Sequence, residues 1–121
     1  MLIASRVVGI DKIYIYLRDE YPAVKNIMEV EIDKIKSHFT DIPEIEMRRG
    51  AGAYICGEES AMIESIEGKR GMPRLRPPFV AQVGLFGRPT LEHNMETLFW
   101  IRDILDKGSD WFANQGVNGR K

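Results

Sequence analysis

The feature that most constrains the fold is a strand pattern that occurs on both sides of one long amphipathic segment. Residues 12–17, KIYIYL, alternate aliphatic side chains with tyrosines, which is the two-residue period of a β-strand with two dissimilar faces. Residues 44–50, EIEMRRG, place Ile45 and Met47 on one face and predict a second, short strand. A strand, a helix and a strand in this order predict an α/β fold with a Rossmann-like parallel sheet and flanking helices.

The segment between these strands predicts the most regular helix of the chain. Pro22 suits the first helical position, because its missing N–H would have no partner there in any case. Apolar residues then recur at steps of three and four, so that one face of the helix is apolar. That face is formed by Val24, Ile27 or Met28, Ile32, Ile35 and Phe39.

Three further helices are predicted from their end signals. Gly9, Gly68 and Gly108 each follow an apolar periodic segment and suit a helix end, and Asn94 suits the N-cap of the last helix. The residues expected to face inward are Ala61, Met62 and Ile66 in the second of these helices and Leu98, Ile101, Ile104 and Leu105 in the third. The first helix is expected to continue an element that begins upstream, and residues 109–121 show no clear final element.

The second strand runs into the glycine-rich stretch GAGAYICGEES, residues 50–60, at the edge of the sheet where α/β folds bind ligands. The dinucleotide fingerprint does not match, because the last glycine of the stretch comes two residues too late. A P-loop needs a lysine and a hydroxyl after its last glycine, whereas Glu58 and Glu59 follow Gly57. A kinase or NTPase function is therefore disfavoured.

Two interpretations of Glu58 and Glu59 remain open. Their carboxylates can accept hydrogen bonds from hydroxyls or ring N–H groups of a ligand, as an acidic residue does on a ribose. Alternatively, the stretch is a tight turn whose glutamates only favour the positive end of a helix dipole. A general acid/base pair is disfavoured, because adjacent side chains at a helix start diverge by about 100°.

The segment from Lys69 to Thr90 predicts a long ordered loop rich in proline, glycine and arginine. Its cations could bind a nucleotide phosphate through forked hydrogen bonds, or they could form a solvated surface. These cations are Lys69, Arg70, Arg74 and Arg76. Phe79 follows two prolines that stiffen the backbone, so its ring could be presented to an adenine or a flavin, although aromatic rings are more commonly core residues.

Composition limits the classes of function. The 17 basic and 18 acidic side chains give a formal charge of -1, which does not favour a nucleic-acid partner or an anionic membrane. No apolar run approaches the roughly 20 residues of a membrane helix, so no direct membrane insertion is expected. The single cysteine, Cys56, excludes an intrachain disulfide and a cysteine-rich metal site, and it favours a reducing cytoplasm. His93 could be a metal ligand, but a surface or capping role is favoured because the other histidine, His38, belongs to a distant helix.

Three stretches, taken together, closely resemble one protein family. They are GAGAYICGEESAMIESIEGKRGMPRLRPPF, GLFGRPT and HNMETL, and the upstream YIYLRDEYP extends the resemblance over nearly the whole chain. They are similar to the NADH- and FMN-binding subunit of the NADH dehydrogenase family. This family includes the beta subunits of NAD-dependent formate dehydrogenases and the diaphorase subunits of NAD-reducing hydrogenases. The resemblance implies that the chain is the central part of an FMN/NADH-binding domain.

The resemblance also implies which residues bind the cofactors, namely Tyr54, Gly57, Glu58, Glu59, Phe79, His93, Asn94 and Thr97. In the family the loop lines FMN and the approaching nicotinamide nucleotide, and an aromatic that matches Phe79 stacks on the NADH adenine. Asn94 and Thr97 keep flavin-lining positions, whereas His93 departs from the asparagine of the family. Ser60 replaces a threonine and keeps its hydroxyl. No catalytic acid or base is expected, because hydride transfer between two cofactors needs only their positioning.

The resemblance further implies what lies outside residues 1–121, which are expected to be a single, partial FMN/NADH-binding domain with little activity by itself. Family members carry an upstream glycine-rich loop, a downstream ubiquitin-like region and a helical domain that holds a [4Fe–4S] cluster. The expected partners are iron–sulfur electron-transfer subunits of the same complex. His93, with Leu91 and Glu92 before it, favours the formate dehydrogenase or hydrogenase branch. The alternative is a non-catalytic fragment or docking module that binds no flavin and forms homo-oligomers through exposed apolar faces.

Overall fold

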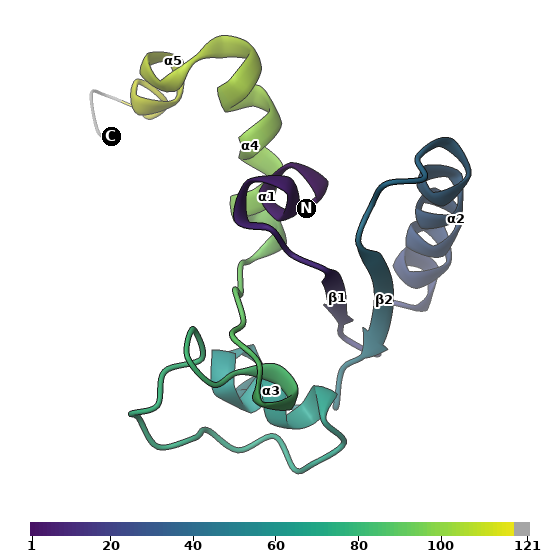
Figure 1. Ribbon diagram of the computed structural model, residues 1–121, viewed down its shortest axis with the longest axis vertical. Coiled ribbons are helices and arrows are strands. Elements are labelled where there is room, and N and C mark those ends of the chain that lie inside the picture. Colours follow the sequence, from purple (N-terminus) through teal and green to yellow (C-terminus); the bar gives the residue numbers. More distant parts are fainter. Residues whose placement is uncertain (118–121) are drawn as a thin grey trace. The chain divides into compact units, whose positions relative to one another are not determined.

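The computed structural model describes residues 1–117, which gather into two compact units (Figure 1). Residues 10–92 form a unit with a small sheet, and residues 1–9 and 93–117 form a helical unit. Each unit is described by itself below.

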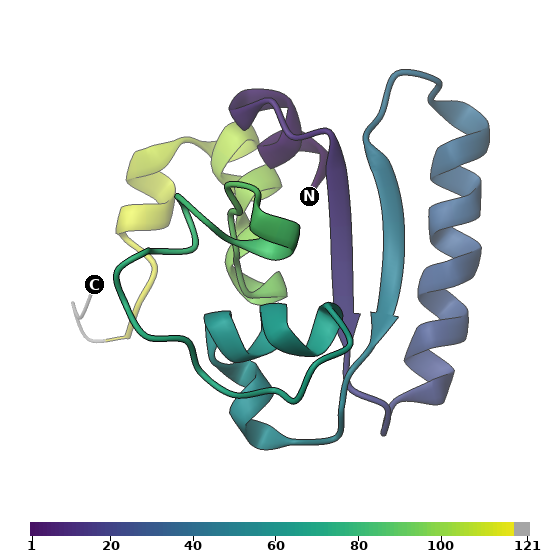
Figure 2. The same cartoon turned by 60° about the horizontal axis from the view of Figure 1, so that its bottom comes forward.

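The unit of residues 10–92 is built on two parallel strands, as the sequence pattern predicts. Strands β1 (Lys12–Leu17) and β2 (Glu44–Arg49) pair in parallel, with Ile13 opposite Ile45 and Ile15 opposite Met47. Helix α2 (Pro22–His38) connects them and lies alongside β2 (Figure 2). A parallel pair needs such a crossover, so the α/β fold with a Rossmann-like order of elements is confirmed.

Helix α2 begins at Pro22 as predicted, but it buries a narrower face than its sequence pattern suggests. Ile32 is buried, and Met28 and Ile35 are half-buried. Of the alternatives Ile27 and Met28, the structure places Met28 inward, since Ile27 is 64% exposed. The predicted inward positions Val24 and Phe39 are wrong, because these side chains are 42% and 57% exposed. The reason is geometric, since a helix of about 26 Å lies against only two strands of about 20 Å, which cover one stripe of it.

Most of the buried core of this unit lies where the sheet meets a short helical region. The 3₁₀-helix η1 (Tyr54–Gly57) is followed by α3 (Glu59–Ile66), and Gly68 ends this region with a left-handed φ of 80°. Ala61 is fully buried as predicted, but Met62 and Ile66 are only half-buried, and Ile63 is the large core residue. The buried hydrophobic residues of this unit are Ile15, Ile32, Ile45, Cys56, Ala61, Ile63 and Leu85.

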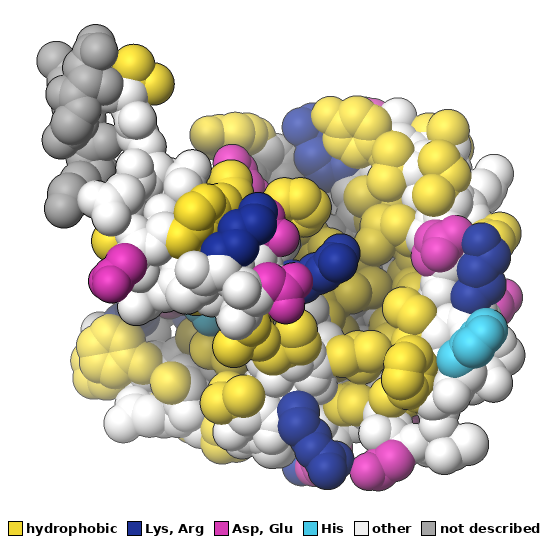
Figure 3. Space-filling model, turned by 90° about the horizontal axis from the view of Figure 1, so that it is seen from above, with side chains coloured by type: hydrophobic (Ala, Val, Ile, Leu, Met, Phe, Trp, Pro, Cys, Tyr) yellow, Lys and Arg dark blue, Asp and Glu magenta, His cyan; other side chains and the backbone are white. Residues whose placement is uncertain are grey.

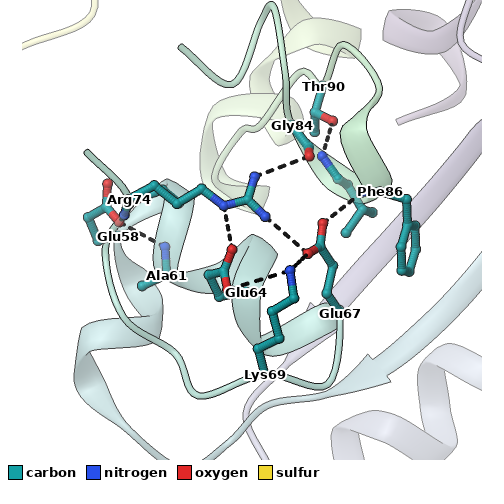
Figure 4. A network of polar contacts seen from close by, with 11 residues as sticks. Glu58, Ala61, Glu64, Glu67, Lys69, Arg74, Gly84, Phe86 and Thr90 are labelled. Atoms are coloured by element: carbon teal, nitrogen blue, oxygen red, sulfur yellow. Dashed lines mark hydrogen bonds and ion pairs between the residues drawn. The ribbon is translucent and has the colours of Figure 1, made fainter. Parts of the chain in front are cut away.

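The long loop of residues 69–90, which contains the 3₁₀-helix η2 (Leu85–Gly87), is attached to α3 mainly by charged groups (Figure 4). Arg74 Nε donates to Glu64 Oε1 at 2.5 Å, and Arg74 Nη1 donates to the carbonyl of Gly84 at 3.2 Å. Arg74 Nη2 also pairs with Glu67 Oε2 at 3.1 Å. One arginine therefore ties the start of the loop, its far end and the helix together.

Glu67, just after α3, is the second centre of this network. Its Oε2 accepts from Lys69 Nζ at 2.7 Å, and its Oε1 accepts from the backbone N–H of Phe86 at 2.7 Å. Its side chain is only 8% exposed. Burial opposes the ionisation of this carboxyl, but the donors from Lys69, Phe86 and Arg74 outweigh burial and hold the pKa of Glu67 below its ordinary value.

The helical unit contains α1 (Leu2–Val8), α4 (Met95–Lys107) and α5 (Ser109–Ala113). Gly9 follows α1 with a left-handed φ of 76°, and Gly108 follows α4, as predicted. Asn94 stands at the N-cap position, but its side chain makes no capping hydrogen bond. The rings of Trp111 and Phe112 pack on Trp100 with centroid distances of 6.2 and 5.7 Å.

Two expectations for the helical unit are corrected. Residues 109–113 form α5, which the sequence did not predict, because five residues are too few to show a helical period. Leu105 is 66% exposed rather than inward, whereas Leu98, Ile101 and Ile104 are half-buried. The sequence showed no clear final element over residues 109–121, and of these residues 118–121 lie outside the described residues. Within residues 1–117 no helix is both long and apolar enough to cross a bilayer.

The network predicts a specific response to acid. Because the pKa of Glu67 is lowered in the folded state, its ionisation stabilises the fold above its ordinary pKa of 4.5. This stabilisation is lost as the pH falls through the lower, folded value. The substitution Glu67→Gln should lower the free energy of unfolding at pH 7 by about 1–3 kcal/mol. It should also flatten the decline of stability below pH about 4.5, measured by urea denaturation at successive pH values.

The control for this experiment is Glu29→Gln, which removes an exposed carboxylate paired with Lys25 on α2. Exposed pairs of this kind contribute about 0–1 kcal/mol, so little change is expected. Equal effects of the two substitutions at pH 7, or an unchanged acid response of Glu67→Gln, would contradict the role given to Glu67.

Candidate functional site

The glycine loop begins at the carboxyl ends of both strands. The N–H of Gly50 donates to the carbonyl of Leu17 at 2.6 Å, and the N–H of Ala51 donates to Tyr16 Oη at 2.9 Å. A Cβ at Gly50 would lie 3.1 Å from both the Leu17 carbonyl oxygen and a carbon of the Tyr16 ring, so a larger residue would be crowded. The loop is therefore fixed to the sheet edge at which α/β folds bind ligands, as the sequence predicts.

The turn that follows leaves one aromatic ring at the surface. Tyr54 opens the 3₁₀-helix η1 and is 95% exposed, whereas Cys56 in the same turn is 2% exposed. Gly57 ends the turn directly before the two glutamates. The buried cysteine anchors the turn, and the exposed tyrosine presents its ring on the outer side.

Glu58 is the N-cap of α3. Its Oε2 accepts from the backbone N–H of Ala61 at 2.8 Å and from Ser60 Oγ at 2.6 Å. Its backbone dihedrals, φ −78° and ψ 137°, are extended rather than helical. The interpretation in which the glutamates serve the helix start therefore applies to Glu58.

The two carboxylates converge on one cation. Arg76 Nη2 lies 2.5 Å from Glu58 Oε1 and 2.6 Å from Glu59 Oε1. The expectation that the two side chains diverge is wrong, because the rotation of about 100° per residue holds only inside a helix and Glu58 precedes it. The arrangement is a pair of anions bridged by a guanidinium at the start of a helix.

The environment keeps Glu58 ionised. Burial opposes its charge, but the donors of Ser60, Ala61 and Arg76 outweigh burial and hold the pKa of Glu58 below its ordinary value. The side chain of Glu59 is 37% exposed, and its ion pair with Arg76 uses Oε1. Glu59 is thus the more accessible acceptor of the two.

Glu92, two residues after the long loop, is a third carboxyl whose charge interacts with this pair. Burial, together with the charges of Glu59 and Glu58, raises the pKa of Glu92 to about 7 against the opposing effect of Arg76. Its Oε2 is enclosed and has no hydrogen-bond partner in the part of the chain that the structure describes. Glu92 therefore carries a proton in a substantial fraction of molecules at neutral pH.

The cations of the long loop have a role that neither earlier interpretation included. Lys69 and Arg74 bind the carboxylates of Glu64 and Glu67, and Arg76 binds the pair at the start of α3. These three cations are therefore already paired with carboxylates, whereas Arg70, the fourth cation of the predicted set, is exposed. Phe79 is 53% exposed, which is consistent with a presented ring and not with a core position.

The remaining predicted cofactor residues belong to the helical unit. His93 and Asn94 precede α4, Thr97 lies in its first turn, and all three are exposed. Among residues 1–117, no group of three or more histidine, cysteine or acidic side chains could hold a metal ion. In the sheet-containing unit, the structure brings together Glu58, Glu59 and Arg76.

Several contacts of this site were not predicted from the sequence. The bridging role of Arg76 and the proximity of Glu92 depend on the path of a long loop, which no periodic pattern encodes. The capping hydrogen bonds of Glu58 had a signal, because an acidic residue directly before an apolar periodic segment is a common N-cap. The contacts of Ser60 had no sequence signal beyond its position in the first turn of the helix.

The comparisons with known proteins agree in pointing to one family. Residues 1–103 match the model of the Nuo51 FMN-binding domain. The F subunit of the NADH-quinone oxidoreductase of Rickettsia bellii is 44% identical over 124 residues, which cover 95% of this chain and 30% of that protein. The alpha subunit of the NAD-reducing hydrogenase HoxS of Cupriavidus necator is 41% identical over 128 residues, which cover 97% of this chain and 21% of that protein.

A solved structure shows the same fold at similar identity. The crystal structure of an NAD+-reducing [NiFe]-hydrogenase in the H2-reduced state contains a chain that superposes with a TM-score of 0.89 and 42% identity. The match covers 98% of this chain and 21% of that chain. The chain thus spans less than a third of the length of each of these relatives. Because the family model matches most of its residues, the chain belongs to the Nuo51 FMN-binding domain family.

Proposed function

We propose that this chain is part of the subunit that binds NADH and FMN in an oxidoreductase complex. The complex transfers electrons between NADH and FMN and onward to iron–sulfur centres. The observation that carries the proposal is the bridged carboxylate pair at the start of α3, in a chain of the FMN-binding family whose sheet-containing unit also exposes the rings of Tyr54 and Phe79. The names of the related proteins support the same class of complex.

The residues of the sheet-containing unit fit the ring and hydroxyl parts of such ligands. Tyr54 and Phe79 present aromatic faces, and the accessible carboxylate of Glu59 can accept hydrogen bonds from ribose hydroxyls or ring N–H groups. The enclosed Oε2 of Glu92, which has no hydrogen-bond partner among residues 1–117, is a further polar atom that a ligand group can satisfy. The phosphate part fits this loop poorly, because Arg76 is already neutralised by two carboxylates.

The contribution of these residues is to bind and orient. FMN, when bound, accepts a hydride from NADH and passes on single electrons. Glu59 fixes a ribose through its hydroxyls, and Phe79 stacks on a flat ring. Gly57 carries no side chain, so a flat ring of the ligand can approach the backbone at this position. The proposed contacts of His93, Asn94 and Thr97 with FMN rest on the family resemblance.

The identity of the complex is proposed from three residues before α4. Leu91, Glu92 and His93 favour the NAD-dependent formate dehydrogenase or hydrogenase branch of the family. We propose a formate dehydrogenase beta subunit, with iron–sulfur electron-transfer subunits as partners and a [4Fe–4S] cluster elsewhere in the full-length subunit. A reducing cytoplasmic location is proposed from the single cysteine.

A non-catalytic docking module is the second candidate. Large hydrophobic side chains are exposed in both units, as Figure 3 shows for one face, and they include Ile27 at 64% and Phe99 at 71%. Such side chains favour association with other subunits or homo-oligomers. The two candidates differ in whether the chain takes part in flavin binding.

We predict that residues 1–121 alone bind FMN weakly and have little NADH oxidation activity, because they supply only part of the proposed site. Titration of FMN into the purified chain, followed by flavin fluorescence, measures this. Tight stoichiometric binding with a shifted flavin spectrum would contradict the prediction. The oligomeric state is read from light scattering on the same sample.

The decisive test of function replaces the matching segment of the HoxS alpha subunit of Cupriavidus necator with this chain. The chimera should retain FMN and oxidise NADH with an artificial electron acceptor. Glu59→Ala should reduce kcat/KM for NADH on the order of tenfold to a hundredfold, because one charged hydrogen bond contributes about 1.5–3 kcal/mol. The control, Glu29→Ala on the distant face of α2, should leave the rate unchanged.

Two outcomes of the chimera experiment would count against the proposal. A folded chimera that holds no FMN would favour the docking module. Unchanged kinetics after Glu59→Ala would show that the carboxylate pair takes no part in binding NADH.

A further inference from the structure

The side chain of Ser60 occupies a central place among the contacts of the site. Ser60 lies in the first turn of α3 and is 1% exposed. Its hydroxyl donates to Glu58 Oε2 at 2.6 Å and accepts from the backbone N–H of Arg74 at 2.8 Å. Both the donor and an acceptor position of the hydroxyl are thus used, which fixes its orientation.

These two hydrogen bonds are part of a closed ring of contacts. From Ser60 the ring passes to Glu58, whose other oxygen, Oε1, binds Arg76 Nη2 at 2.5 Å. Arg76 belongs to the same loop as Arg74, two residues further on, so the backbone closes the ring. The orientation of the Glu58 carboxylate and the position of the loop are therefore fixed together.

The ring also reaches the second carboxylate. Arg76 Nη2 binds Glu59 Oε1 at 2.6 Å, so the nitrogen that completes the ring also orients Glu59. If the hydroxyl of Ser60 is removed, Oε2 of Glu58 loses a donor and the backbone N–H of Arg74 loses its acceptor, while the Arg74 side chain keeps its contacts with Glu64 and Glu67. The orientations of Glu58 and Glu59, which Arg76 connects, are then less restricted.

We propose that Ser60 is a positioning residue whose buried hydroxyl locks the long loop to the carboxylate pair and sets the geometry in which Glu59 meets its ligand. The part of this proposal that concerns ligand binding at Glu59 rests on the proposed function. The hydrogen bonds that hold the loop to the carboxylate pair do not, since they are contacts within the chain. The hydroxyl makes both contacts, so Ser60→Thr, which keeps the hydroxyl, should retain them.

The first experiment measures the lock in the chain itself, without cofactors. The pKa of Glu58 is followed by ¹³C NMR of its side-chain carboxyl, and the exchange of the Arg74 amide is followed in the same samples. In Ser60→Ala the pKa of Glu58 should rise, because a hydrogen bond that lowers it is lost, and the Arg74 amide should exchange faster. Ser60→Thr should restore both values.

The matched control is Ser65→Ala, in the last turn of the same helix. Its hydroxyl contacts Tyr16 Oη at 3.0 Å and belongs to no contact of the ring. An unchanged pKa of Glu58 in Ser60→Ala, or an equal rise in Ser65→Ala, would overturn the proposal. If Ser60→Ala does not fold, Ser60→Cys keeps the volume with a weaker donor, and an unchanged pKa of Glu58 in that variant has the same meaning.

The second experiment measures the consequence for the ligand in the chimera. Ser60→Ala should raise KM for NADH about tenfold with little change in kcat, because it disturbs binding geometry and not the chemical step. Ser60→Thr should match the parent chimera. An unchanged KM would restrict Ser60 to a structural role and overturn the proposal. A chimera without FMN would overturn the proposed function instead, and the NMR titration would still decide on the lock.

Discussion

The guanidinium of Arg76 between Glu58 and Glu59 is the contact on which the rest of the site depends. It places two carboxylates side by side without the repulsion that an unbridged pair would suffer, and it holds the loop of residues 69–90 at the start of α3. Such a pair contributes little when fully exposed, but here Glu58 is also bound by Ser60 and Ala61. Binding of a ligand at Glu59 then starts from a largely ordered acceptor, which reduces the entropy lost on association.

Charge explains why this glycine loop differs from a phosphate cradle. A phosphate loop presents N–H groups and a lysine, whereas here the N–H of Ala61 is capped by Glu58 and the nearest arginine is shared between two anions. Such a loop presents acceptors to its surroundings. It is therefore suited to ligand groups that donate hydrogen bonds, such as ribose hydroxyls and the N–H groups of a flavin ring. Glu92, whose pKa is raised by burial, adds a carboxyl that can donate when protonated and accept when ionised.

Much of the fold follows from local sequence patterns. The alternation in KIYIYL and EIEMRRG predicted β1 and β2, Pro22 predicted the start of α2, and Gly9 and Gly68 predicted helix ends, because each signal lies within a few residues. The exposed positions Val24 and Leu105 and the helix α5 were not predicted. How much of a helix is buried depends on what packs against it, and here the sheet has only two strands. In the site, the convergence of Glu58, Glu59 and Arg76 could not be predicted, since it is set by contacts between residues 18 positions apart.

The central claim is that the carboxylates of this loop bind hydroxyl or ring N–H donors, and not the phosphate, of a bound nucleotide. The most direct measurement is a crystal structure of the chimera with FMN and NADH bound. The account predicts an oxygen of Glu59 within hydrogen-bond distance of a ligand hydroxyl or ring N–H, with Arg76 still bridging the two glutamates. A phosphate bound to the backbone N–H groups of residues 57–60, or to Arg76 released from its carboxylates, would contradict it.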